Sequence, residues 1–282
     1  MLNPAWKDGL YCDLSEAKVS IEDRGYLLGD GVYEVIRIYN RKPFSLTAHL
    51  DRLERSASAI RLDVPYTKDE LEAVIFELIG KSCYANGYIY MQLTRGSAKR
   101  DHLFPADAEP TLVMYTRELP PLPVIDSVNP AGCITVPDER WLNCYIKSIN
   151  LLPNLLARQK AYESGSIEAL FYRPGGLLTE GTRSNLFAVF DGVVYTHPAT
   201  NLILAGITRE IVIDLMQKLA LPFKEEVILL EDISKASEVW ITSTTLEVQP
   251  INSIDGNVLD HASPGKICMM LMKEFRNLAA ED

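Results

Sequence analysis

Two residues of this chain have side chains suited to chemistry on carbonyl compounds. Lys147 lies in the mostly uncharged stretch 141–150, which we predict to form a half-buried strand. A desolvated lysine loses its proton readily and then acts as a nucleophile toward carbonyl carbons. Glu180 follows 33 positions later, and a carboxylate can keep the nitrogen of a pyridine ring protonated. Together the two residues suggest an enzyme that uses pyridoxal 5'-phosphate (PLP).

Two later places in the sequence could bind a phosphate group. Ile207 and Thr208 open a predicted helix, and the N–H groups at a helix N-terminus attract anions. Ser243 and Thr244 follow a predicted strand at 238–241 and could form a second wall of the same site. A plain helix cap and local turn hydrogen bonds, without any ligand, are the alternative interpretations.

Basic residues in the first half of the chain could bind anionic parts of a ligand. Arg52 lies in the predicted helix 46–62 and could hold a phosphate, whereas an ion pair on the helix surface is the simpler interpretation. Arg100 and His102 lie in a basic loop of an acidic protein and could hold a carboxylate. A solvated loop without a ligand is the alternative for this pair.

Composition and charge limit the class of protein. The 282 residues are 47% apolar and 23% charged, as in globular proteins of one large or two smaller domains. The net charge of -10 disfavours nucleic acid and anionic membranes as partners, and no apolar run is long enough for a membrane span. The five cysteines form no CxxC motif, which indicates neither disulfides nor a zinc site, and the N-terminus lacks a signal-peptide pattern. We therefore expect a cytoplasmic protein without a metal.

Three prolines within the stretch 119–123 predict a stiff linker between two domains. We expect a small α/β domain at 1–119, the linker at 120–124 and a larger domain at 125–282. In the first domain, hydrophobic periodicity predicts helices at 46–62 and 68–83 and strands at 33–39, 88–94 and 111–116.

In the second domain, turn signals predict a sheet built from hairpins. Asp191-Gly192 separates two apolar runs and is the strongest hairpin signal, followed by Asp255-Gly256 and Gly175-Gly176. Helices are predicted at 155–164 and 208–219. We therefore expect an α+β protein whose larger domain has a twisted sheet or partial barrel with flanking helices.

Six motifs of this chain occur in the order in which a known superfamily has them, and they carry a resemblance to that superfamily. The segments 23–34, 49–53, 146–148, 179–181, 206–209 and 242–245 together resemble the fold-type IV PLP-dependent aminotransferases, over nearly the whole chain. Arg100-x-His102 followed by Phe104-Pro105 resembles the carboxylate trap of the D-amino-acid (D-alanine) aminotransferases. Arg183 departs from that group, which carries a small hydroxyl residue there, and the departure bears on side-chain specificity.

The resemblance implies a role for each candidate residue. Lys147 would bind the cofactor covalently and then act as the general base, while Glu180 would hold the pyridine nitrogen. The cofactor phosphate would be bound by Arg52, Ile207, Thr208, Ser243 and Thr244. The substrate carboxylate would be bound by Tyr33, Arg100 and His102.

The resemblance also implies an activity and an assembly. We expect ping-pong transamination between D-amino acids, such as D-alanine or D-glutamate, and 2-oxo acids, in a homodimer whose active site is shared across the interface. An L-branched-chain aminotransferase is the main alternative, since it would share the cofactor site. An (R)-amine transaminase, an aminodeoxychorismate lyase and a non-catalytic PLP-binding protein also stay open.

Overall fold

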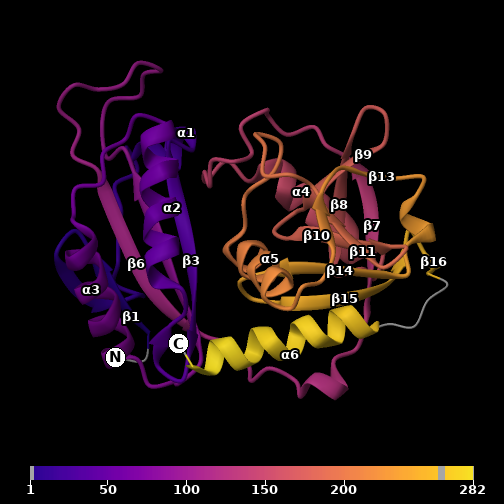
Figure 1. The fold of residues 1–282 in the computed structure, drawn as a ribbon. Helices are drawn as coiled ribbons and strands as arrows, with labels where there is room; N and C mark the ends of the chain where they lie inside the picture. The colour runs from indigo at the N-terminus through magenta and orange to yellow at the C-terminus, as the bar shows by residue number, and fades with distance from the viewer. Residues whose placement is uncertain (1–2, 260–263, 282) are drawn as a thin grey trace. The chain divides into compact units, whose positions relative to one another are not determined.

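The computed structural model describes residues 3–259 and 264–281 and divides the chain into two compact units (Figure 1). The first takes in the chain up to Pro121 together with Ile146–Asn150, and the second consists of Leu122–Tyr145 and Leu151–Glu281. The division after Pro121 falls within the proline-rich stretch. The short segment that carries Lys147 belongs to the first unit, whereas the predicted boundaries assigned it to the second.

The first unit is an antiparallel sheet of six strands in the order β2-β1-β6-β5-β3-β4. Two long helices, α2 and α3, pack on this sheet (Figure 1). The strands are β1 Pro4–Lys7, β2 Leu10–Asp13, β3 Gly31–Tyr39, β4 Lys42–Pro43, β5 Gly87–Thr94 and β6 Thr111–Glu118. The helices are α1 Arg24–Leu28, α2 Leu46–Ala59 and α3 Lys68–Lys81.

Alternation along the strands decides which face of this sheet is covered. In β5, Ile89, Met91 and Leu93 are fully buried in the core beneath the helices, whereas the residues between them are only partly buried. Because side chains of a strand alternate between its faces, Tyr90 and Gln92 must lie on the opposite face. That face carries tyrosines and polar groups, so it can contribute to a site.

The second unit is built on a sheet in the order β12-β11-β10-β14-β15-β7-β8-β9-β13, with β16 paired to β15. Its strands are β7 Ala131–Pro137, β8 Glu168–Arg173, β9 Leu177–Gly181, β10 Asn185–Phe190, β11 Val193–Thr196, β12 Phe223–Glu225, β13 Ile228–Leu229, β14 Glu238–Ser243, β15 Glu247–Ile254 and β16 Asn257–Val258. Its helices are α4 Leu152–Glu163, α5 Ile207–Lys218 and α6 Lys266–Glu281. α4 packs on β7 and β8, while α5 and α6 contact each other and β14 (Figure 1). None of the helices in the described part of the chain is long and apolar enough to span a membrane.

The structure confirms the α+β class, the predicted helices and the predicted hairpins. Asp191 and Gly192 have φ values of 51° and 77°, and Asp255 and Gly256 have 51° and 76°. Two consecutive positive φ values are those of the turn whose twist matches paired antiparallel strands, and Asp-Gly adopts them at low cost.

The predicted strand at 141–150 is wrong. This stretch is a turn followed by irregular chain, and its only ladder contact is an isolated bridge between Ser148 and Val32. Its backbone groups bind elsewhere: the N–H of Cys144 donates to the carbonyl of Asn201, and the N–H of Lys147 donates to a side-chain hydroxyl. This mostly uncharged stretch therefore forms no strand, because no partner strand is paired with it along its length.

Candidate active site

Lys147 is held through its backbone between β3 and α2 of the first unit. The N–H of Tyr33 donates to the carbonyl of Lys147 (3.0 Å), and the N–H of Ile149 donates to the carbonyl of Gly31 (3.1 Å). On the other side, the N–H of Lys147 donates to Oγ of Ser56 in α2 (3.2 Å). The side chain of Lys147 therefore starts from a fixed point, although no regular strand carries it.

The amine of Lys147 lies over an aromatic ring. Its Nζ is 4.3 Å from the ring centroid of Tyr33, one of the predicted substrate residues. Tyr33 stacks on Tyr90 (5.8 Å between centroids), and Tyr90 stacks on Tyr115 (5.1 Å). Burial raises the pKa of Tyr90, so this hydroxyl stays protonated and the middle of the row is neutral. The structure thus brings two predicted residues, Lys147 and Tyr33, together.

Arg52 is part of a buried cluster, so the surface ion pair considered from the sequence is wrong. Its Nε and Nη2 donate to Oε1 and Oε2 of Glu34 at 2.7 and 2.9 Å, and Nδ1 of His49 lies 2.8 Å from Oε2. All three side chains are buried. Burial would raise the pKa of Glu34, but the charge and hydrogen bonds of Arg52 outweigh it and hold that pKa well below its usual range. The paired bonds fix the plane of the Arg52 guanidinium.

Glu180, in the second unit, is a buried carboxylate bound on both oxygens. Oε1 accepts from Nη1 of Arg140 (2.7 Å), while Oε2 accepts from the N–H of Leu204 (3.0 Å) and Nδ2 of Asn185 (3.2 Å). Burial raises the pKa of Glu180 to about 7, against the opposing charge of Arg140. A carboxylate in this state can either hold a protonated nitrogen or take up a proton near neutral pH.

Arg140 and Asn185 have no recognisable signal in the sequence. Arg140 is fixed by Asp138, whose Oδ1 and Oδ2 each accept from it at 2.9 Å, and its guanidinium lies 4.2 Å from the ring centroid of Phe171. Its rotamer is therefore set before any ligand binds. The contact with Glu180 spans forty positions of the chain, so spacing could not reveal it.

The predicted phosphate ligands of the second unit lie at a helix start and a strand end. Ile207 and Thr208 form the first turn of α5, where backbone N–H groups have no intrahelical acceptor. Ser243 is the last residue of β14, which α5 contacts, and Thr244 begins the turn after it. This donor set of helix N–H groups and hydroxyls suits a phosphate, and the buried carboxylate of Glu180 suits a protonated ring nitrogen. The residues therefore fit PLP.

Gly206, the N-cap of α5, is tightly enclosed. A Cβ at this position would overlap Oδ1 of Asn185, whose Nδ2 donates to Glu180 and to the carbonyl of Leu204. The start of α5 and the carboxylate of Glu180 are thus coupled through one amide side chain.

Arg100 and His102 lie in the loop between β5 and β6 and are exposed. Their side chains make no hydrogen bond or ion pair with any residue in the described ranges, so within one chain they are not brought to Tyr33 or Lys147. Arg183 is also exposed, because buried Glu168 holds the turn around it through the N–H and hydroxyl of Thr182 and the hydroxyl of Ser184.

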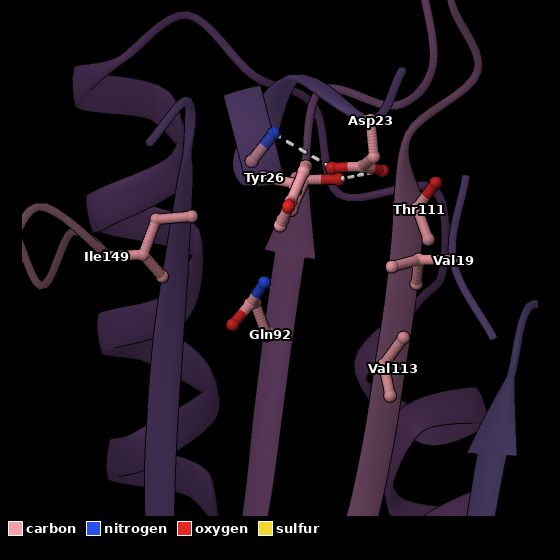
Figure 2. Close-up of a pocket in the computed structure, with 9 residues that line it drawn as sticks. Val19, Asp23, Tyr26, Gln92, Thr111, Val113 and Ile149 are labelled. Atoms are coloured by element: carbon pink, nitrogen blue, oxygen red, sulfur yellow. Dashed lines mark hydrogen bonds between the residues drawn. The ribbon is translucent and has the colours of Figure 1, made fainter. Parts of the chain in front are cut away.

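The face of the first sheet opposite helices α2 and α3 has a pocket of about 360 Å³ beside α1 (Figure 2). Its walls include Asp23, Tyr26, Gln92, Val113 and Ile149. Oδ1 of Asp23 caps α1 and Oδ2 accepts from the hydroxyl of a threonine at the end of β5, as the dashed lines in Figure 2 show. None of the predicted cofactor or substrate residues is among those that line this pocket.

Comparison with known proteins gives full-length similarities. The family model "Amino-transferase class IV" matches residues 31–254. The D-alanine aminotransferase of Staphylococcus haemolyticus is 43% identical over 268 residues, 95% of each chain. That of Bacillus licheniformis is 42% identical over 270 residues, 96% of this chain and 95% of its own.

Solved structures are similar over both units. The branched-chain aminotransferase of Thermoproteus uzoniensis has a TM-score of 0.89 at 30% identity and covers 99% of this chain and 96% of its own. The branched-chain aminotransferase of Escherichia coli has a TM-score of 0.87 at 26% identity, with 99% and 94% covered. A putative 4-amino-4-deoxychorismate lyase of Legionella pneumophila has a TM-score of 0.83 at 25% identity, with 94% and 97% covered.

Proposed function

This chain belongs to the class IV aminotransferase family, and we propose that it transfers the amino group of D-amino acids to 2-oxo acids with PLP as cofactor. The observation that carries the proposal is the 42–43% identity, over about 95% of each chain, to relatives named D-alanine aminotransferase. The branched-chain aminotransferases among the similar structures are 26–30% identical. Lys147, Glu180 and the basic loop with Arg100 and His102 supply the groups that this reaction needs.

Lys147 and Glu180 do the central work in this proposal. PLP, when bound, supplies an electron sink for the electron pair left when the α-proton of the amino acid is removed. Lys147 would hold the cofactor covalently until the amino group of the substrate displaces it, and its freed Nζ would then remove the α-proton and return a proton to the cofactor side. Glu180 would keep the ring nitrogen protonated, and the positive charge of Arg140 favours the charged form of Glu180 against the effect of burial.

We assign the cofactor phosphate to one charged donor and a group of neutral donors. Arg52 supplies a charged guanidinium whose plane is fixed by Glu34. The first-turn N–H groups of α5 and the hydroxyls of Thr208, Ser243 and Thr244 supply neutral donors. In this proposal Ile207 contributes its backbone N–H, because its side chain is apolar and buried.

The substrate carboxylate is assigned to Tyr33, Arg100 and His102. The side chains of the two basic residues have no hydrogen-bond or ion-pair partner among the described residues of one chain. We therefore propose a homodimer in which the loop of one protomer serves the site of its partner. Since Lys147 acts from one face only, the side on which the carboxylate is held selects the D-enantiomer.

The test is the visible spectrum of the purified holoenzyme, with D-alanine added to one sample and L-leucine to another. Loss of the visible band of the bound cofactor with D-alanine alone would support the proposal. Loss with L-leucine alone would move the enzyme to branched-chain substrates, which the similar solved structures make the second candidate. A purified protein without a visible band, even after incubation with PLP, would contradict the cofactor assignment.

The proposal also covers the cellular compartment and the binding partners of the protein. All five cysteines are free thiols in the structure, which suits a reducing compartment such as the cytoplasm. The net charge of -10 gives no general attraction to nucleic acid or to anionic lipid. We expect amino acids, 2-oxo acids and a second copy of the chain to be the partners.

A further inference from the structure

The loop that carries Arg100 and His102 begins at a buried ionic cluster. Arg24 and Arg95 share the carboxylate of Asp30: Nε of each lies 2.8 and 2.9 Å from Oδ2, and Nη2 of Arg95 lies 3.1 Å from Oδ1. Both arginine side chains are buried. We call Arg24, Asp30 and Arg95 the loop clamp.

Arg24 binds the loop at its centre. Its Nη1 donates to the carbonyl of Asp101 (2.7 Å), and its backbone N–H donates to the carbonyl of Gly96 (2.9 Å). Asp101 stands between Arg100 and His102, and its Oδ1 accepts from the N–H of Leu103 (3.0 Å). A buried guanidinium therefore holds the backbone between the two residues assigned to the substrate carboxylate.

Arg95 binds the loop from the other side. Its guanidinium carbon lies 3.7 Å from the ring centroid of Phe104, although that ring is 49% exposed. Its Nη1 and Nη2 also donate to the carbonyls of Arg61 and Ile60, both at 2.8 Å, just beyond the end of α2. The loop is thus held at two residues, Asp101 and Phe104, by one ionic cluster. Through Arg95 that cluster also binds the chain just after α2.

We propose that the loop clamp positions Arg100 and His102 for the substrate carboxylate, and this inference rests on the proposed function. A loop of this length between two strands would otherwise lose conformational freedom when substrate binds, and that loss weakens binding. A clamp that orders the loop before substrate binds removes this loss of conformational freedom at the binding step, so it should strengthen substrate binding. Arg24, Asp30 and Arg95 act through the loop and touch no substrate.

The first test is amide hydrogen exchange in the protein without substrate. Phe104→Ala removes the ring from Arg95 without leaving a buried charge, and the exposed position limits damage to the fold. We expect exchange of the amides at 98–104 to become about tenfold faster, with the amides of β5 unchanged. Phe76→Ala is the matched control, because Phe76 is 52% exposed on α3 and makes no ring or cation contact with the described residues of the loop.

The second test is steady-state kinetics of the holoenzyme with D-alanine. Phe104→Ala should raise KM about tenfold and change kcat by less than about twofold, since the chemistry at Lys147 is untouched. Arg24→Lys keeps the positive charge beside Asp30 but cannot reach both Asp30 and the carbonyl of Asp101, so it should change KM in the same direction. Phe76→Ala should match the unaltered enzyme.

The two tests separate the clamp from the proposed function. Unchanged amide exchange at 98–104 in both Phe104→Ala and Arg24→Lys would overturn the clamp. Faster exchange with unchanged KM would also overturn it, because the ordered loop would then have no effect on substrate. If the unaltered enzyme fails to react with D-alanine, the proposed function fails, while the exchange experiment still shows whether the cluster orders the loop.

Discussion

Nη1 of Arg140 lies 2.7 Å from Oε1 of Glu180, within the second unit of the fold. Burial raises the pKa of Glu180 to about 7, and Arg140 is the largest influence in the other direction. Only the charged carboxylate can hold a protonated ring nitrogen. This ion pair therefore determines the pH range in which the proposed cofactor partner is charged.

Arg140→Gln should slow the half-reaction with D-alanine by about tenfold at neutral pH. Without Arg140, burial loses its strongest opposing influence and the pKa of Glu180 rises further, so the carboxylate becomes charged only at higher pH. The acid limb of the rate profile should move to higher pH. The measurement is the rate of loss of the visible band from about pH 6 to about pH 9.

Arg173→Gln is the matched control for this variant. Arg173 also approaches Asp138, with Nε 3.1 Å from Oδ2, but it makes no ion pair with Glu180. Its profile should keep the position seen in the unaltered enzyme. Superimposable profiles for Arg140→Gln and the unaltered enzyme would show that Arg140 does not control Glu180.

Lys147→Ala should lower turnover by more than about 1000-fold, because both the covalent attachment and the general base are removed. The visible band of the holoenzyme should shift as well, since the cofactor would no longer be attached. Lys160→Ala removes an exposed lysine of α4 and serves as the control. Turnover of Lys147→Ala close to that of the control would reject the assignment.

Arg100→Ala should lower kcat/KM for D-alanine by about 100-fold, because the carboxylate would lose its charged partner. PLP affinity should stay the same, since Arg100 is assigned to the substrate alone. Lys99→Ala removes the neighbouring exposed cation and tests for a general charge effect. Equal losses in the two variants would point to the charge of the loop in general and not to a specific clamp on the carboxylate.

Gly206→Ala should weaken PLP binding by about tenfold, measured by titrating the apoenzyme. The backbone at Gly206 has a φ of -72°, so alanine fits the conformation, but its Cβ must displace Asn185, which donates to Glu180. Gly80→Ala is the control, because a Cβ there meets no atom within 4 Å. Alanine in place of this helical glycine should stabilise the protein by about 0.5–1 kcal/mol. Unchanged PLP affinity in Gly206→Ala would separate Gly206 from the cofactor site.

Glu34→Gln should lower the free energy of unfolding by about 3–5 kcal/mol at neutral pH, because the buried guanidinium of Arg52 would lose the carboxylate that balances its charge. The pKa of Glu34 is lowered in the folded protein, so its contribution is present above the ordinary glutamate pKa and is lost as pH falls. The difference in the free energy of unfolding between the variant and the unaltered protein should therefore become smaller as the pH falls. Glu54 on α2 forms an exposed ion pair with Lys68 on α3. Glu54→Gln should therefore change the free energy of unfolding by less than about 1 kcal/mol. A constant difference across the pH range would contradict the assigned ionic state.

Local sequence was enough to predict much of the fold. Asp191-Gly192 and Asp255-Gly256 form the predicted turns, because the positive φ values of such turns depend mainly on those two residues. The long helices follow from residues at helical spacing, such as Leu50 and Leu53, which are buried against the first sheet. The stretch around Lys147 failed as a strand, because a strand also needs a partner that the local sequence does not reveal.

The sequence by itself determined which residue types were available for the chemistry, above all Lys147 and Glu180, and it was sufficient to identify the family. Only the tertiary structure decided the surroundings of these residues. Three contacts between residues distant in the chain show this. Arg140 binds Glu180, Arg52 binds Glu34, and Arg24 of the loop clamp binds the carbonyl of Asp101 next to Arg100. Such contacts arise from packing and burial, which set charge state and position but leave no periodic pattern in the sequence.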